Sequence, residues 1–164
     1  MADPIGCQIP EIHQAISAHR DSPLWDKPVA VELGTGVGAP SIALALHLRH
    51  YFGLKGSSRL PLVVSTDVAP QALALTIANA WSNDASIATL RMNHTNVTSV
   101  AEMKEALFSD SHREFAILMG SSLQAIFHET QNSDSVLWPV LDILLDKKNP
   151  EAIAAFVHTR TEPL

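Results

Sequence analysis

The sequence predicts an α/β fold in which a doubly wound, mainly parallel sheet is covered by helices. Short apolar runs that suit buried strands alternate along the chain with segments whose apolar residues recur at helical spacing. A glycine-rich turn, Gly34 to Gly38, joins the first apolar run directly to the helical segment that follows it. Because strands that alternate with helices are joined by right-handed crossovers, we expect the strands to run parallel to one another.

The expected strands share a short apolar core and end at polar or glycine residues. They span residues 29–33, 60–66, 86–92, 115–119 and 151–159. The expected helices have apolar residues at intervals of three and four positions. They span residues 10–20, 40–50, 70–81, 99–108 and 137–145.

Three details of these helices carry specific expectations. Leu73, Ile77 and Trp81 lie four residues apart, which predicts that this stripe of the helix over 70–81 packs inward. The segment that begins at Ser99 has the pattern of a capping box, so the next helix is expected to begin there. Pro139 is expected in the first turn of the last helix, because proline is disfavoured farther inside.

Composition and charge exclude several classes of protein. A chain of 164 residues with 46% hydrophobic and 17% charged residues fits one ordinary globular domain. A net charge of −6 gives no electrostatic footprint for nucleic acid or an anionic membrane, so neither is an expected partner. No apolar run approaches the roughly 20 residues of a membrane span.

Cysteine content and the N-terminal sequence bear on the compartment. The single cysteine excludes an internal disulfide and fits a reducing environment. The N-terminal residues lack the basic and apolar regions of a signal peptide. We therefore expect a cytoplasmic location, with the nucleus as an alternative. The expected organisation is one domain over 28–164, preceded by an N-terminal helix and lead-in over 1–27.

The glycine turn is the main functional signal in the sequence. Gly34, Gly36 and Gly38 follow the first strand at alternate positions, and Pro40 suits the first turn of a helix. Glycine accepts positive φ and has no Cβ that would hold a ligand away from the backbone. The N-terminus of the following helix adds unpaired N–H groups and a positive dipole end. Together these features predict a loop that binds a nucleotide-like cofactor.

Other polar or small residues fall at the ends of the later strands. Asp67 ends the second strand, Asn93 follows the third, and Gly120 and Ser121 follow the fourth. Ligands of doubly wound sheets bind beyond the carboxyl ends of the strands, where the strand order reverses. These residues are therefore expected to share one site with the glycine turn.

Two cofactors compete for this site. With Ala39 as a third small residue, the loop satisfies the loose dinucleotide pattern, although Asp67 lies farther along than the roughly 20 residues usual for the ribose-binding acid. Glu32, two residues before Gly34, argues against a dinucleotide, because a carboxylate there would repel a pyrophosphate. Beside a zwitterionic methionine, the same carboxylate would attract the ammonium.

The segments VELGTGVGAPSIALAL and TDVAPQALALTIANA resemble the seven-strand class of S-adenosylmethionine-dependent methyltransferases. Within that class they are most similar to the lysine-methyltransferase-like group, methyltransferase family 16. FAILMGSS and AIAAFVHTR, which ends at Arg160, resemble its fourth and fifth strands. The resemblance covers residues 28–160 and implies a Rossmann-like fold, S-adenosylmethionine as the cofactor and protein lysine as the methyl acceptor.

The resemblance also assigns parts of the cofactor to particular residues. It implies that the backbone of Gly34, Thr35 and Gly36 cradles the methionine part and that Glu32 meets the ammonium. Asp67 would accept both ribose hydroxyls, a task suited to a carboxylate. The remaining assignments place residues around the base and the sulfonium. They put Val68 and Met92 beside the adenine ring, Asn93 near its edge, and Ser121 beside the sulfonium.

Two departures from this group keep alternatives open. Ser121 and Gln124 stand where the group usually has an Asp and a Tyr, and no sixth or seventh strand follows residues 151–159. The alternatives are a cofactor-binding pseudoenzyme or regulatory subunit and, third, an NAD-dependent oxidoreductase. A protein substrate is the expected partner, and a partner chain could cover the exposed sheet edge. No general base and no metal site is expected.

Overall fold

The computed structural model describes residues 14, 17–18, 28–53, 61–108, 114–120, 133–145 and 153–156. Its strands form one five-stranded sheet with the order β3-β2-β1-β4-β5, and every neighbouring pair is parallel. The strands are β1 (Pro28–Leu33), β2 (Leu62–Asp67), β3 (Ala88–Arg91), β4 (Glu114–Gly120) and β5 (Ile153–Phe156). The predicted parallel α/β sheet is therefore confirmed.

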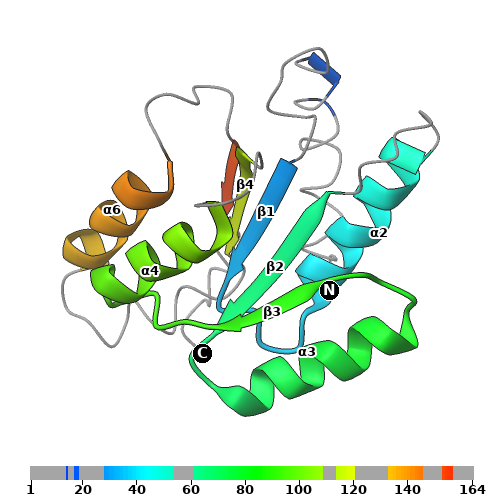
Figure 1. The fold of residues 1–164 in the computed structure, drawn as a ribbon, viewed down its shortest axis with the longest axis horizontal. Coiled ribbons are helices and arrows are strands. Elements are labelled where there is room, and N and C mark those ends of the chain that lie inside the picture. The colour runs from blue at the N-terminus through cyan, green and yellow to red at the C-terminus, as the bar shows by residue number, and fades with distance from the viewer. Residues whose placement is uncertain are drawn as a thin grey trace, which may run out of the picture.

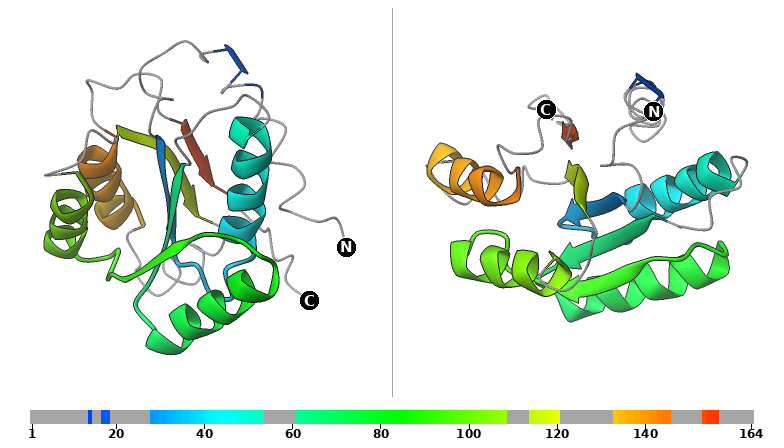
Figure 2. Two further views of the ribbon diagram at one scale, coloured as in Figure 1. Left: turned by 45° about the vertical axis from the view of Figure 1, so that its right-hand side comes forward. Right: turned by 45° about the horizontal axis from the view of Figure 1, so that its top comes forward.

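Helices cover both faces of this sheet (Figure 1). They are α2 (Ala39–Gly53), α3 (Pro70–Ser82), α4 (Val97–Phe108) and α6 (Ser133–Leu144). Helices α4 and α6 lie side by side on one face, and α2 lies on the opposite face (Figure 2). Helix α3 contacts β2, β3 and α2 near the β3 edge. This is the doubly wound, Rossmann-like arrangement that the alternation of strands and helices predicts.

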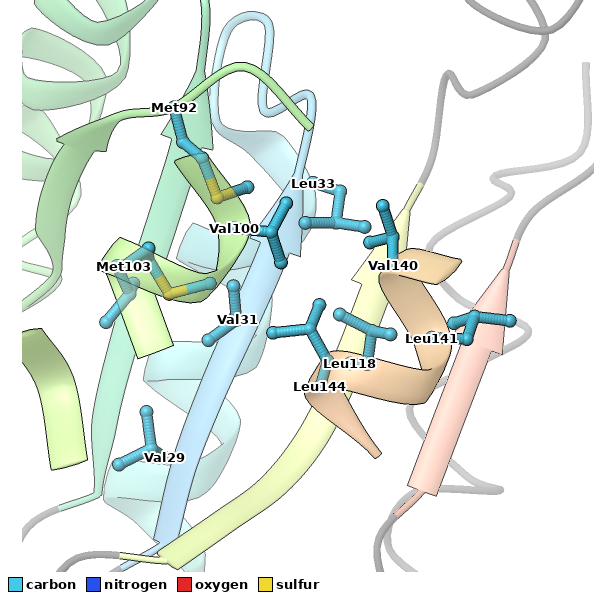
Figure 3. Packing of buried hydrophobic residues seen from close by; sticks show 11 residues of the cluster. Val29, Val31, Leu33, Met92, Val100, Met103, Leu118, Val140, Leu141 and Leu144 are labelled. Atoms are coloured by element: carbon cyan, nitrogen blue, oxygen red, sulfur yellow. The ribbon is translucent and has the colours of Figure 1, made fainter. Parts of the chain in front are cut away.

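The central strand β1 is buried on both faces. Its side chains alternate, so Val29, Val31 and Leu33 point toward α4 and α6, whereas Ala30 points toward α2. Figure 3 shows the core on the α4 and α6 side, where Leu118 of β4 packs with side chains of both helices. Because side chains pack against both faces of β1, this strand is fixed firmly in place. The point at which the loop after Leu33 begins is therefore fixed as well.

The strand register brings the carboxyl ends of the strands to one edge. Leu33 pairs with Thr66 of β2 on one side and with Gly120 of β4 on the other. Asp67 pairs with Arg91 at the end of β3. The sheet order reverses at β1, because β2 and β3 lie to one side of it and β4 and β5 to the other. The loop after β1 thus begins at the place where ligands of such sheets bind.

The prediction that Leu73, Ile77 and Trp81 form the buried face of α3 is wrong for two of the three residues. Leu73 is half-buried, but Ile77 is 54% exposed and Trp81 is 88% exposed. The inward face carries the small residues Thr76 and Ala80, which are 0% and 4% exposed. The reason is close packing, because α3 lies directly against the glycine loop and larger side chains would hold it away.

Two expected helix starts are also wrong. Helix α4 begins at Val97 rather than at Ser99. Its cap is Asn96, whose Oδ1 accepts hydrogen bonds from the backbone N–H groups of Thr98 (2.9 Å) and Ser99 (3.3 Å). Helix α6 begins at Ser133, so Pro139 lies inside the helix rather than in its first turn.

Some expectations concern residues that the structure does not describe. Apart from residues 14 and 17–18, the helix and lead-in expected over 1–27 lie outside the described residues, and so does Arg160. Within the described residues, no helix is both long and apolar enough to cross a membrane.

Candidate functional site

The loop between β1 and α2 has a backbone that suits glycine at three positions. Gly34, Gly36 and Gly38 have φ angles of 69°, 56° and 85°, in the left-handed region. Backbone hydrogen bonds fix the turn. The N–H of Gly38 donates to the carbonyl of Thr35 (2.9 Å), and the N–H of Thr35 donates to Thr66 (2.9 Å). The loop is therefore a preformed turn held against the end of β2.

Gly36 and Gly38 have different surroundings. A Cβ at Gly38 would lie 2.6 Å from Cγ2 of Thr76, so this glycine lets α3 pack against the loop. Thr76 also donates a 3.2 Å hydrogen bond through Oγ1 to the carbonyl of Gly36. A Cβ at Gly36 would meet nothing within 4 Å, and Gly36 is exposed. Of these two glycines, Gly36 is thus the one whose backbone a ligand can approach.

Glu32 is a fully buried carboxylate beneath the loop, with 0% of its surface exposed. Its Oε2 accepts hydrogen bonds from Oγ1 of Thr35 (2.7 Å) and from Oγ of Ser41 in the first turn of α2. Its carbonyl oxygen accepts from Oγ1 of Thr66 (2.6 Å). Glu32 therefore ties β1, the loop, α2 and β2 together. Its expected contact with a ligand's ammonium stays a prediction.

Asp67 lies at the end of β2, partly exposed, with both carboxylate oxygens turned to backbone donors. Oδ2 accepts from the N–H of Gly36 (3.1 Å), and Oδ1 accepts from the N–H of Ala69 (2.9 Å). A carboxylate has about four acceptor positions, so each oxygen keeps one for a further donor. The arrangement leaves Asp67 able to accept hydrogen bonds from two neighbouring hydroxyls of a ligand.

The residues expected around a purine base lie at the ends of β2 and β3. Val68 is 48% exposed beside Asp67. Met92 is joined to Asp67 by a 3.0 Å backbone hydrogen bond, and its side chain is buried in the core beneath α4 (Figure 3). Asn93 is exposed, and its Oδ1 accepts hydrogen bonds from the N–H and Oγ1 of Thr95. Their contacts with a base stay predictions.

The structure thus gathers most of the predicted site residues at one edge of the sheet. Glu32, Gly34, Thr35 and Gly36 come from the end of β1 and its loop, Asp67 and Val68 from the end of β2, and Met92 and Asn93 from the end of β3. Ser121, which follows β4, lies outside the described residues. Within the described residues, no group of three or more His, Cys, Asp or Glu side chains could hold a metal ion.

Sequence reasoning missed His94, which lies in the turn after β3. The side chain is 8% exposed, and neither ring nitrogen has a hydrogen-bond partner among the described residues. Burial lowers the pKa of His94, and the Asp67 carboxylate partly opposes this effect. The available signal was a histidine directly beyond a strand's carboxyl end, but its polar neighbours gave no indication that it is buried.

Comparison with known proteins adds no family to this description. No protein-family model matches the chain, and no curated protein matches it significantly. The fold and the loop therefore define the class on their own. The chain is a Rossmann-like α/β protein with a glycine loop and an acidic residue at the carboxyl edge of its sheet.

Proposed function

We propose that this chain binds S-adenosylmethionine at the carboxyl edge of its sheet and transfers the methyl group to a protein acceptor, with lysine as the acceptor class. The hydrogen bond between the N–H of Gly36 and Oδ2 of Asp67 is the main support, because it brings the glycine loop and the β2 carboxylate into one site. The sequence resemblance of residues 28–160 to methyltransferases supports the choice of cofactor and acceptor.

Burial of Glu32 supports S-adenosylmethionine over a dinucleotide. A carboxylate that is fully buried under the loop acts through a medium of low dielectric constant, where charge interactions are strong. Its negative charge favours the ammonium of a zwitterionic methionine above the loop and opposes a pyrophosphate. The open backbone at Gly36 gives the methionine part room to approach.

The proposed reaction asks little chemistry of the protein. When bound, S-adenosylmethionine supplies an activated methyl group, whose bond to sulfur breaks as the bond to the neutral acceptor nitrogen forms. The chain's residues contribute by holding the adenosyl and methionine parts in line with the acceptor and by excluding water. No general base is assigned.

A second candidate is a cofactor-binding subunit without methyl transfer. Ser121 and Gln124 favour it, because they stand where the resembled group has an Asp and a Tyr. A third candidate is an NAD-dependent oxidoreductase, which buried Glu32 opposes. The proposal includes a cytoplasmic location for the protein. It also includes a partner chain that covers an edge of the sheet.

Calorimetric titration of the full chain with S-adenosylmethionine, S-adenosylhomocysteine and NAD separates these candidates. We expect saturable binding of the two sulfur-containing ligands and none of NAD. Transfer of a labelled methyl group from S-adenosylmethionine to proteins of a cell extract then distinguishes the enzyme from the subunit. Binding of NAD alone would exclude both the methyltransferase and the subunit that binds S-adenosylmethionine without methyl transfer.

A further inference from the structure

Among the described residues, the ring of His94 has no hydrogen-bond partner, although the other polar side chains of its turn are hydrogen-bonded. Asn93 and Thr95 bond to each other, and Asn96 caps the first turn of α4. Oγ of Ser99 accepts a 3.2 Å hydrogen bond from the N–H of Asn93. These bonds fix the turn, and the turn places the imidazole of His94 in a buried position.

The imidazole carries two polar atoms that the described part of the protein leaves unpaired. The side chain is 8% exposed, and neither Nδ1 nor Nε2 has a hydrogen-bond partner there. A neutral imidazole has one donor and one acceptor, and burying them without partners is unfavourable. Native proteins rarely keep such groups unpaired unless a water or a ligand completes them.

The order of the strands indicates which part of a ligand His94 would meet. The glycine loop follows β1, Asp67 ends β2, and His94 lies just beyond β3, while the sheet order is β3-β2-β1. A ligand whose methionine part lies at the loop and whose ribose lies at Asp67 therefore extends its base toward β3. The backbone bond from Met92 to Asp67 holds the ends of β2 and β3 together.

We propose that His94 recognises the purine base of the bound cofactor through a hydrogen bond from one ring nitrogen. This inference rests on the proposed function, because it takes an adenosyl ligand as the occupant of the site. Adenine presents both ring-nitrogen acceptors and an amino donor along its edge. Either tautomer of the neutral imidazole can therefore form one matching hydrogen bond.

The first test is calorimetric titration with S-adenosylhomocysteine on the full chain and on His94→Phe. Phenylalanine fills a similar volume and removes both nitrogens. We expect roughly tenfold weaker binding, the loss that follows from one hydrogen bond. The midpoint of urea unfolding should stay equal or rise, because an unpaired buried polar group has been removed. His50→Phe, at the exposed end of α2, is the matched control and should leave binding unchanged.

Equal binding by the unmodified chain and His94→Phe would overturn the inference while leaving the proposed function intact. Absence of binding by the unmodified chain would overturn both. A purely structural histidine would instead lose stability on substitution and keep its affinity.

Two further measurements locate the contact at the base. S-ribosylhomocysteine, which lacks the base, should bind the unmodified chain and His94→Phe equally weakly, because the contact that the substitution removes is then absent. If His94→Phe does not fold, nitrogen-15 spectra of the histidine rings of the unmodified chain give the answer. One ring-nitrogen signal should shift when S-adenosylhomocysteine saturates the protein, and no shift in any histidine would overturn the inference.

Discussion

The backbone N–H of Gly36 donates a 3.1 Å hydrogen bond to Oδ2 of Asp67, across 31 positions of sequence. This bond joins the loop after β1 to the end of β2 at the place where the strand order reverses. Oδ1 of the same carboxylate accepts from the N–H of Ala69 at the entry to α3. Asp67 therefore links the loop, its own strand and the next helix, and it keeps acceptor positions for a ligand.

Gly38→Ala should destabilise the fold more than Gly36→Ala. Both substitutions place a side chain at positive φ, which costs about 1–2 kcal/mol. At Gly38 the new Cβ also meets Cγ2 of Thr76 at 2.6 Å, so we expect at least about 1 kcal/mol more. Urea unfolding measures the difference, and adding Thr76→Ser should recover part of it. Equal losses at both glycines would contradict the close packing of α3.

Glu32→Ala should lower the free energy of unfolding by about 3 kcal/mol, because it leaves the hydroxyls of Thr35 and Ser41 buried without their acceptor. Glu32→Gln keeps one carbonyl oxygen and should cost about 1 kcal/mol. Chemical unfolding of the two variants checks the order. A Glu32→Gln protein as unstable as Glu32→Ala would mean that the charge, rather than the acceptor oxygen, holds the loop.

The stability of the protein should fall as the pH drops below about 6.5, the usual pKa of histidine. Burial lowers the pKa of His94 in the folded protein, so the unfolded chain binds the proton first as the pH decreases. The destabilisation that His94 causes is absent well above a pH of about 6.5. It grows as the pH falls, until the pH reaches the pKa of His94 in the folded protein. Urea unfolding at several pH values should show a shallower pH dependence for His94→Phe than for His50→Phe. Identical slopes would contradict the buried position of His94.

Trp81→Gln should change the free energy of unfolding by less than about 0.5 kcal/mol, because the side chain is 88% exposed. Ala80→Gln is the matched comparison, since Ala80 is 4% exposed on the inward face of the same helix. Overpacking there should cost about 1–3 kcal/mol. A large loss for Trp81→Gln would restore the original expectation of an inward stripe.

The parallel sheet was predictable from the sequence because its signals are local. Apolar runs that end in Leu33, Asp67 and Gly120 identify buried strands and their polar ends. The glycines at alternate positions after Leu33 identify the turn, since positive φ is a property of single residues. Crossover handedness then brings these ends to one edge without further information.

The errors concern features that depend on tertiary packing. The Leu73, Ile77 and Trp81 stripe has the correct period for a buried face, but the close approach of Gly38 to Thr76 selects the small-residue face instead. Periodicity detects hydrophobic faces and gives no weight to steric fit. The burial of His94 likewise depends on how its turn packs in the folded protein. The amino-acid composition of the turn does not determine this packing.

The central claim is that the Asp67 carboxylate helps bind an adenosyl ligand at the sheet's edge. The most direct test is calorimetric titration of S-adenosylhomocysteine into the unmodified chain, Asp67→Asn and Asp84→Asn. Asp84 is the matched control because its side chain is 95% exposed and pairs with Arg49 away from the loop. We expect Asp67→Asn to weaken binding at least about tenfold and Asp84→Asn to leave it unchanged. Equal affinities for all three proteins would contradict the claim.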